Sequence, residues 1–177
     1  MKKIDGVNPH FFRTYITQHT SNTMGTRGFY GFRYKGRYIL FYNHWDSYCD
    51  GLGNQILDEL RKFTEEDWIT LMSILKKHLR TGTLKEEMEI TEGKNFEGLM
   101  KAATDPAEYA IAYVGRELSP PYMMTQYTYI IDLDKKFLRV FANEDTFKFS
   151  LYELPKSMSS YDERDSDVDT DLEDMDE

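Results

Sequence analysis

Apolar and polar residues alternate along two stretches near the start of the chain, 29–34 (FYGFRY) and 37–43 (RYILFYN). Lys35 and Gly36 stand between them. A two-residue loop with glycine between two alternating stretches is typical of a β-hairpin, because glycine readily adopts the positive φ that such a turn requires. The pattern therefore predicts an antiparallel hairpin over residues 24–42 that turns at these two residues.

The apolar spacing becomes helical after residue 53. In 54–63 the apolar residues recur three or four positions apart, and a second run begins at Thr64, with Asp67 three residues later in the manner of a capping box. Gly82 follows this run, where glycine commonly ends a helix. Two helices are therefore predicted, with apolar faces formed by Ile56, Leu57, Leu60, Phe63, Trp68, Leu71, Met72, Leu75 and Leu79.

The middle of the chain gives a weaker pattern. Residues 83–104 show no clear period and are expected to be partly irregular. Asp105 and Pro106 together resemble the N-cap and first residue of a helix. The stretch 106–118 (PAEYAIAYVGREL) is therefore predicted to be a third helix.

Alternation returns near the C-terminal end of the domain. Two runs flank residues 134–136, and a third covers 146–154 (TFKFSLYEL), which predicts a meander of three strands. The order of elements is then hairpin, helices, meander. This order predicts an α+β fold in which helices cover an antiparallel sheet made of the N-terminal hairpin and the C-terminal meander.

Charge divides the chain into a neutral body and an acidic end. The net charge is −9. Residues 158–177 hold ten Asp and Glu and one Arg, which account for all of it, and the rest has 21 basic and 21 acidic residues. We expect an N-terminal arm (1–23), a single α+β domain (24–157) and a disordered acidic tail (158–177), because the tail has too few apolar residues to offset the entropy lost on folding.

The same charge pattern bears on partners and location. A folded part without net positive charge has no basic field, so nucleic acid is not expected as a partner. The acidic tail favours a protein partner with a basic surface. No apolar run reaches the roughly 18 residues that span a bilayer, and no secretory signal is recognisable. We therefore expect no membrane contact and an intracellular location, in the cytoplasm, the nucleus or a virus particle.

Cysteine and histidine are sparse. Cys49 is the single cysteine, so no internal disulfide is expected. The four histidines, His10, His19, His44 and His78, are far apart in the sequence and none has a second ligand at metal spacing. No metal site and no cofactor are therefore predicted.

Several short motifs resemble those of one protein family. MGTRG at 24–28, YNHWDSY at 42–48, GLG at 51–53 and YIIDLD at 129–134 are similar to a family of uncharacterised small proteins of fungi, phages and large DNA viruses. The resemblance covers most of the domain in outline and is specific in its first thirty residues. Family members often begin at their MGTR, which implies either that 1–23 is an added arm or that Met24 is an internal start. The resemblance implies no activity.

The opening stretch is also similar, more loosely, to N-terminal-nucleophile (Ntn) hydrolases, which implies an Ntn-hydrolase-like fold. In threonine-type members a Gly-Thr bond is cut, and the new amine of the threonine serves as the base. Here Thr26 follows Gly25, and Asn43 and Asp46 close the second strand. Cleavage would give Thr26 a free amine with a pKa of about 8. The segment 54–60 lacks the lysine that activates the threonine in these enzymes.

Two further chemistries have a basis in the loop before the first helix. Cys49 precedes a helix start, which stabilises a thiolate, and His44 lies five residues earlier, so Cys49 is an alternative nucleophile. Against this, Asp46 and Asp50 would raise the pKa of the thiol, and a lone cysteine is usually a packing residue. The segment 50–55 (DGLGNQ) could instead present backbone amides to an anion, although its glycines serve a turn equally well.

The polar segment 43–48 (NHWDSY), at the end of the second strand, is the strongest indication of a binding site. Polar side chains there are costly to bury unless they hydrogen-bond to one another. Asp46 is expected to accept hydrogen bonds from the amides of 47–53 and so to fix a pocket. The predicted pocket residues are Arg27, Asn43, His44, Asp46, Ser47, Tyr48, Gly51 and Gly53.

These features favour a non-catalytic binding domain with a recognition pocket at the strand end and an acidic tail that contacts a basic protein partner. A small molecule is an alternative occupant of the pocket. The alternative function is an N-terminal-nucleophile amidohydrolase that uses Thr26 after cleavage of the Gly25–Thr26 bond.

Overall fold

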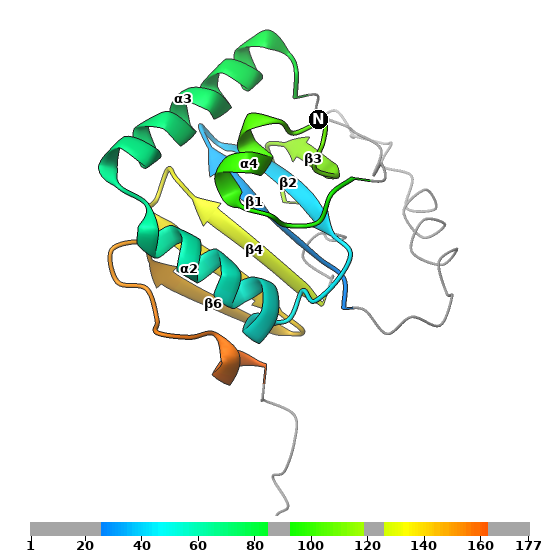
Figure 1. The fold of residues 1–177 in the computed structure, drawn as a ribbon, viewed down its shortest axis with the longest axis vertical. Helices are drawn as coiled ribbons and strands as arrows, with labels where there is room; N and C mark the ends of the chain where they lie inside the picture. Colours follow the sequence, from blue (N-terminus) through cyan, green and yellow to red (C-terminus); the bar gives the residue numbers. More distant parts are fainter. Residues whose placement is uncertain (1–25, 85–92, 119–125, 163–177) are drawn as a thin grey trace, which may run out of the picture.

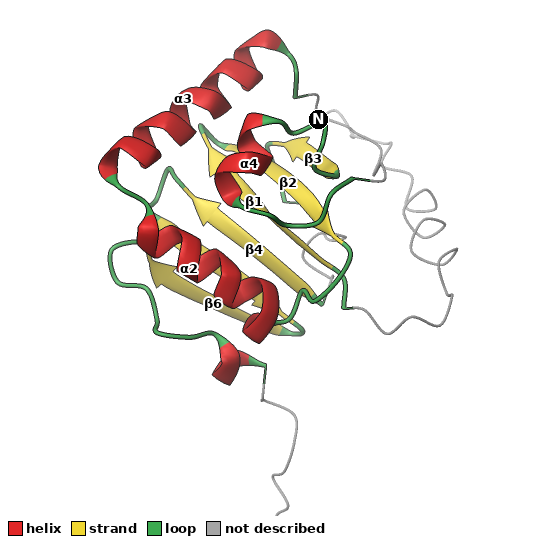
Figure 2. Cartoon of the chain, in the orientation of Figure 1, coloured by secondary structure: helices red, strands yellow, loops and turns green. Residues whose placement is uncertain are grey.

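The computed structural model describes residues 26–84, 93–118 and 126–162. Its centre is a six-stranded sheet in the order β3-β2-β1-β4-β5-β6. The described α-helices lie on one face of this sheet (Figure 1, Figure 2), which confirms the predicted α+β class. The strands are β1 (Gly28–Tyr34), β2 (Arg37–Asn43), β3 (Ile111–Gly115), β4 (Tyr127–Asp132), β5 (Phe137–Ala142) and β6 (Asp145–Ser150), and the helices are α2 (Asn54–Lys62), α3 (Glu65–Thr81) and α4 (Leu99–Thr104).

The predicted hairpin is present, since β1 and β2 pair antiparallel along their whole length. Both turn residues have positive φ, 50° at Lys35 and 69° at Gly36. This is the type I′ geometry, whose twist matches that of the flanking strands. The carboxylate of Asp134, in the turn between β4 and β5, accepts hydrogen bonds from both turn N–H groups, at 2.7 and 2.8 Å. Two turns far apart in the sequence are thereby tied together.

The predicted meander is also present, as the antiparallel strands β4, β5 and β6. The hairpin and the meander meet through a parallel pair, β1 with β4, in which Gly28 lies opposite Tyr127. The sheet is therefore mostly antiparallel with one parallel pair at its centre. In the hairpin, β2 pairs with β3 on its outer side, so β1 is left with one free edge, and β4 pairs with that edge. Parallel strands such as β1 and β4 need a crossover connection between them.

The helix predicted over 106–118 is wrong, since this stretch contains β3, which pairs antiparallel with β2. Asp105 does not begin a helix but ends α4, and α4 lies in the region 83–104 that had no clear pattern. Ile111 and Val114 are buried in the core, and β-branched residues favour a strand that packs on its neighbours. Pairing with β2, which the local sequence does not reveal, decides the outcome.

The two predicted helices, α2 and α3, form as expected. Thr64 and Asp67 make a capping box: the Asp67 N–H donates to the Thr64 hydroxyl at 3.2 Å, and the Thr64 N–H donates to the Asp67 carboxylate at 2.7 Å. Gly82 ends α3 in the left-handed conformation, with φ 69°. Leu71 and Leu75 of α3 are buried against the core.

Both faces of the central strands are apolar. Tyr30, Phe32 and Phe41 belong to the main core that the helices complete, whereas Leu40 and Ile130 belong to a smaller cluster on the other face. All five are fully buried. Successive side chains on a strand point to opposite faces, so this division follows from the alternation. The hairpin aromatics therefore serve mainly to pack the sheet.

The last described residues, 155–162, pack on the domain and are called the C-terminal clasp here. Met158 is fully buried, and the ring of Tyr161 lies 4.6 Å from that of Phe147 between centroids. The boundary predicted after residue 157 is therefore corrected, because the clasp fills part of the core. Outside the described residues lie the predicted arm (1–23) and the remainder of the predicted tail (163–177).

Candidate functional site

Asn43 ends β2 and organises the loop that follows. The residue is 2% exposed. Its amide nitrogen donates to the Trp45 carbonyl and to the Ser47 hydroxyl, the latter at 2.9 Å, and its amide oxygen accepts from the Phe96 N–H at 3.1 Å. Both ends of the buried amide thus have partners, as burial requires. Asn43 therefore joins this loop to a second segment, 93–98.

A second set of contacts holds the same two segments together. The His44 N–H donates to the side-chain oxygen of Asn95 at 3.1 Å. The His44 ring nitrogen Nδ1 lies 3.2 Å from the Tyr42 hydroxyl, and the His44 and Trp45 rings pack edge to face with centroids 4.5 Å apart. The loop and the segment 93–98 are therefore fixed relative to each other, so a cavity between them has ordered walls.

Asp46 contributes to the loop through its backbone. Its φ is 50°, in the left-handed region that aspartate tolerates better than most residues. Its carbonyl oxygen accepts the Leu52 N–H at 2.9 Å. The predicted role of the Asp46 carboxylate as acceptor of the loop amides is wrong, because the N–H groups of Cys49 and Asp50 donate to the carboxylate of Asp162 instead, at 3.0 and 2.8 Å.

The two glycines of the loop allow close packing. They lie in a π-helical turn, η1 (Cys49–Gly53), that leads into α2. A Cβ at Gly51 would lie 2.5 Å from the Asp46 carbonyl oxygen, and one at Gly53 would lie 2.9 Å from the Met158 sulfur. Any larger residue would push the loop or the clasp away. These glycines therefore serve packing. The amides that could hold an anion have partners within the chain, because the Asp50 N–H donates to the Asp162 carboxylate and the next three N–H groups donate to backbone carbonyls.

A cavity of about 180 Å³, called the strand-end pocket here, lies where these segments meet. Among the described residues that line it, only Asp46 is charged. Trp45 is 42% exposed and presents a large aromatic surface. Within the described structure, the Asp46 carboxylate and the Gln55 amide make no side-chain hydrogen bond. The lining residues are Asn43, Trp45, Asp46, Leu52, Gln55, Asn95 and Phe96.

Two of the predicted pocket residues, Asn43 and Asp46, line the strand-end pocket. Arg27 lies near Tyr42. Burial raises the pKa of Tyr42, and the positive charge of Arg27 acts in the opposite direction. The ring of Tyr48 packs against that of Tyr127, with centroids 5.7 Å apart. The other predicted residues hold the loop in place from within it: His44, Ser47, Gly51 and Gly53.

Sequence reasoning missed several lining residues. Gln55 lies in the first turn of α2, where an exposed polar residue is common and does not indicate a binding site. Asn95 and Phe96 reach the pocket through hydrogen bonds to His44 and Asn43, which lie more than 50 positions earlier in the chain. Their one signal in the sequence is a short polar segment bounded by Gly93 and Gly98, which is typical of a loop with a defined shape.

The two candidate nucleophiles differ in what the structure says of them. Thr26 is 7% exposed and its carbonyl accepts the Ser47 N–H at 3.2 Å. Gly25 lies outside the described residues, so cleavage before Thr26 stays a prediction. Cys49 is fully buried, and burial raises the pKa of its thiol to about 12, although a hydrogen bond from Tyr129 acts in the opposite direction. Such a thiol is protonated at neutral pH, which favours packing over catalysis.

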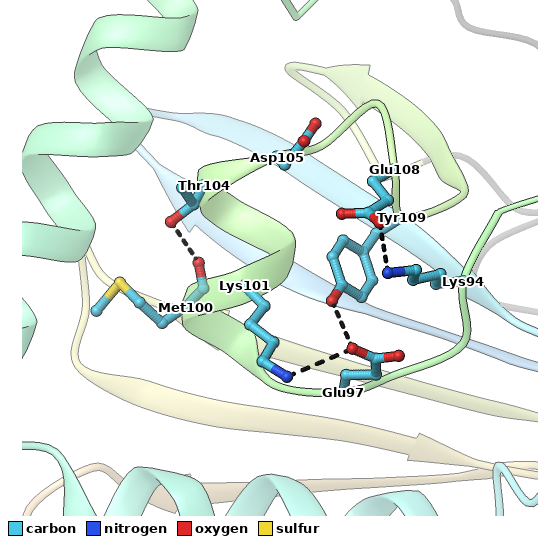
Figure 3. Close-up of a pocket in the computed structure, with 8 residues that line it drawn as sticks. All are labelled: Lys94, Glu97, Met100, Lys101, Thr104, Asp105, Glu108 and Tyr109. Atoms are coloured by element: carbon cyan, nitrogen blue, oxygen red, sulfur yellow. Dashed lines mark hydrogen bonds and ion pairs between the residues drawn. The ribbon is translucent and has the colours of Figure 1, made fainter.

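A larger hollow of about 390 Å³, called the charged basin here, lies against the other side chains of the segment 93–98 (Figure 3). Glu97 accepts hydrogen bonds from the Tyr109 hydroxyl at 3.0 Å and from the Lys101 ammonium at 3.4 Å. These bonds hold the pKa of Glu97 below its usual range. Lys94 pairs with Glu108. The lining residues are Lys94, Glu97, Met100, Lys101, Thr104, Asp105, Glu108 and Tyr109.

The strand-end pocket is the better candidate of the two hollows. In the charged basin the lysines and glutamates pair with one another at the surface, and a ligand would have to displace those contacts (Figure 3). In the strand-end pocket the charged group that lines it, Asp46, has no such partner in the described structure. A ligand can bind a polar group that makes no ion pair, beside an exposed aromatic residue, without first breaking contacts within the protein.

Comparison of the chain with protein-family models, curated protein sequences and solved structures gave no match. Across residues 26–84, 93–118 and 126–162, no group of three or more His, Cys, Asp and Glu side chains is arranged to hold a metal ion. Among the helices of that part of the chain, none is long and apolar enough to cross a membrane. The candidate function therefore rests on the geometry of the strand-end pocket.

Proposed function

We propose that the protein is a non-catalytic binding domain whose strand-end pocket receives one side chain of a protein partner. The observation that carries this proposal is the meeting, around one cavity, of an exposed aromatic ring at Trp45 with the polar groups of Asp46 and Gln55. Tryptophan is enriched among the residues that contribute most to protein–protein binding energy. Polar groups beside such an anchor give orientation and specificity.

The size of the pocket favours a side chain over a cofactor or metabolite. Small-molecule sites usually enclose about 300 to 1,000 Å³. The strand-end pocket has a volume of about 180 Å³, so it is too small to enclose most of a typical cofactor or metabolite. A single side chain projecting from a longer segment fits the available space, and the segment itself would rest on the exposed rings of Trp45 and Tyr48.

The walls of the pocket are held by contacts that a partner need not create. Asn43 binds the backbone of both bordering segments, and Asn95 accepts the His44 N–H. Asp162 fixes the turn that carries Leu52. A site that is ordered before binding loses less conformational entropy when the partner arrives. This order supports recognition of a defined sequence.

A peptide library displayed on phage and selected against the full chain tests the proposal. Selected peptides are then measured against two matched variants, Trp45→Ser and Tyr152→Ser. Both variants remove one exposed aromatic ring, at 42% and 84% exposure, but only Trp45 lines the pocket. We expect the selected peptides to bind the wild type and Tyr152→Ser equally and Trp45→Ser at least about tenfold more weakly, the loss typical of an anchor residue.

The contrary result is equally clear. If the peptides bind both variants as tightly as they bind the wild type, the recognition surface lies elsewhere on the protein. Thermal unfolding of each variant provides the control for folding: Tyr152→Ser should leave the melting temperature unchanged, and Trp45→Ser, which also loses the ring contact to His44, should lower it only slightly.

A further inference from the structure

We infer that the side chain received by the strand-end pocket is the cationic group of a lysine or arginine in a basic segment of the partner. This inference rests on the proposed binding function and specifies its ligand. Asp46 is the one charged residue among the described residues of the pocket wall. Its carboxylate accepts hydrogen bonds and carries negative charge, so it attracts a cationic donor and repels an acidic side chain.

The remaining wall fits the same chemistry. Trp45 lines the pocket and is 42% exposed, and tryptophan is the best aromatic partner of ammonium and guanidinium groups. The amide oxygen of Gln55 is a second acceptor. An apolar side chain would instead cover the Asp46 carboxylate without giving it a hydrogen bond, which is unfavourable.

Lys94 and Lys101, which flank the pocket residues Asn95 and Phe96 in the sequence, are already paired. Lys94 pairs with Glu108, and Lys101 pairs with Glu97, on the side of the segment 93–98 that faces the charged basin (Figure 3). These two lysines are therefore engaged with their own glutamates and do not neutralise Asp46.

Charge next to the pocket adds to this preference. The described chain ends at Asp162, whose carboxylate accepts the N–H groups of Cys49 and Asp50 in the pocket loop. Asp162 thus adds a second carboxylate to the loop that carries Asp46, and this increases the local attraction for a segment with several basic residues.

Nuclear magnetic resonance with the full, isotope-labelled chain tests the inference. The probes are four capped seven-residue glycine peptides that carry one central arginine, lysine, glutamate or leucine. We expect the arginine and lysine peptides to shift the indole signal of Trp45 and the side-chain amide signals of Gln55 and Asn95, and the glutamate and leucine peptides to leave them unchanged. Binding should weaken as salt is added, because charges are screened.

Two variants that each remove one negative charge make the test specific. Asp46→Asn keeps the shape of the residue and its tolerance of positive φ, whereas Glu66→Gln changes an exposed residue of α3 that lines neither hollow. We expect the arginine peptide to bind Asp46→Asn about tenfold more weakly, as loss of a charged hydrogen-bond partner predicts, and to bind Glu66→Gln as it binds the wild type.

The outcomes separate this inference from the proposed function. The inference is overturned if the leucine or glutamate peptide shifts the pocket signals while the basic peptides do not, or if Asp46→Asn binds the arginine peptide as tightly as the wild type does. Phage-selected peptides that depend on Trp45 but lack lysine and arginine would also overturn it, and in that case the proposed binding function would stand.

Discussion

The backbone N–H of Cys49 donates a 3.0 Å hydrogen bond to the carboxylate of Asp162, 113 positions later in the chain. The same carboxylate accepts the Asp50 N–H at 2.8 Å, and the side-chain oxygen of Asn54 accepts the Met158 N–H at 2.8 Å. The C-terminal clasp thus completes the turn that leads from the strand-end pocket into α2. Stability of the clasp and order of the pocket loop are therefore linked.

Replacing Asp162 should destabilise the protein. Asp162→Ala removes the acceptor of two backbone N–H groups, and hydrogen bonds to a charged group contribute roughly 1.5–3 kcal/mol. Because Asp162 is partly exposed and water can replace it, we expect a loss of about 1–2 kcal/mol in the free energy of unfolding, measured by urea denaturation. Asp165→Ala, which removes the same charge beyond the clasp, is the control. Equal stability of both variants would contradict the role of Asp162.

Truncation should separate the clasp from the acidic residues beyond it. Removing 158–177 deletes Met158, which is fully buried, and full burial of a methionine contributes roughly 1.5–3 kcal/mol. We expect that truncation to lower the melting temperature by several degrees. Removing only 163–177 should have a much smaller effect, because this segment has few apolar residues to bury. Calorimetry on both truncated chains gives the comparison, and equal melting temperatures would exclude a stabilising clasp.

Alkaline pH should destabilise the fold through its buried acids. Burial raises the pKa of Cys49 from 9.0 to about 12 and that of Tyr127 from 10.0 to about 12. The unfolded chain therefore releases these protons first, so stability is complete below pH 9 and falls as pH rises toward 12. Cys49 alone should account for about 2 kcal/mol by pH 10.5.

Cys49→Ala provides the control for this pH effect. Urea denaturation at pH 8 and pH 10.5 should show a smaller alkaline loss in the variant than in the wild type, although the variant is less stable at pH 8 because a buried side chain is shortened. The same alkaline loss in both proteins would mean that the Cys49 thiol ionises normally in the folded state.

The opening stretch of the chain bears on the hydrolase alternative. If Thr26 were a nucleophile, the Gly25–Thr26 bond would have to break to give Thr26 its own amine. We predict that the purified chain stays whole, and that Thr26→Ala changes stability by less than about 2 kcal/mol, because the contact to Ser47 uses the backbone carbonyl and survives the substitution. Intact mass spectrometry is the measurement, and a chain that begins at Thr26 would restore the hydrolase.

Local signals explain what could be predicted from the sequence. Lys35 and Gly36 define the hairpin because a tight turn depends on its own residues. Thr64 and Asp67 define the start of α3 for the same reason, since a capping box joins groups three residues apart. Asn43 was expected at a pocket because a polar side chain at a strand end needs buried partners.

Contacts between residues far apart in the chain explain which features could not be predicted from the sequence. β3 is a strand because β2 lies beside it, and the parallel contact of β1 with β4 has no local signature. Asp162 looks like one more acid of an acidic tail, although it fixes the turn that Asp46 was expected to fix. Asn95 enters the site through a contact to His44, 51 positions away. Such contacts depend on the whole fold and leave little trace in the sequence.

The structure of a bound peptide would decide where this protein binds. Nuclear Overhauser contacts between a phage-selected peptide and the side chains of the full chain give that answer directly. We predict contacts from one peptide side chain to the Trp45 ring and to the amide groups of Gln55 and Asn95, which line the strand-end pocket. Contacts confined to the charged basin around Lys101 and Tyr109, with none to Trp45, would contradict the proposed site.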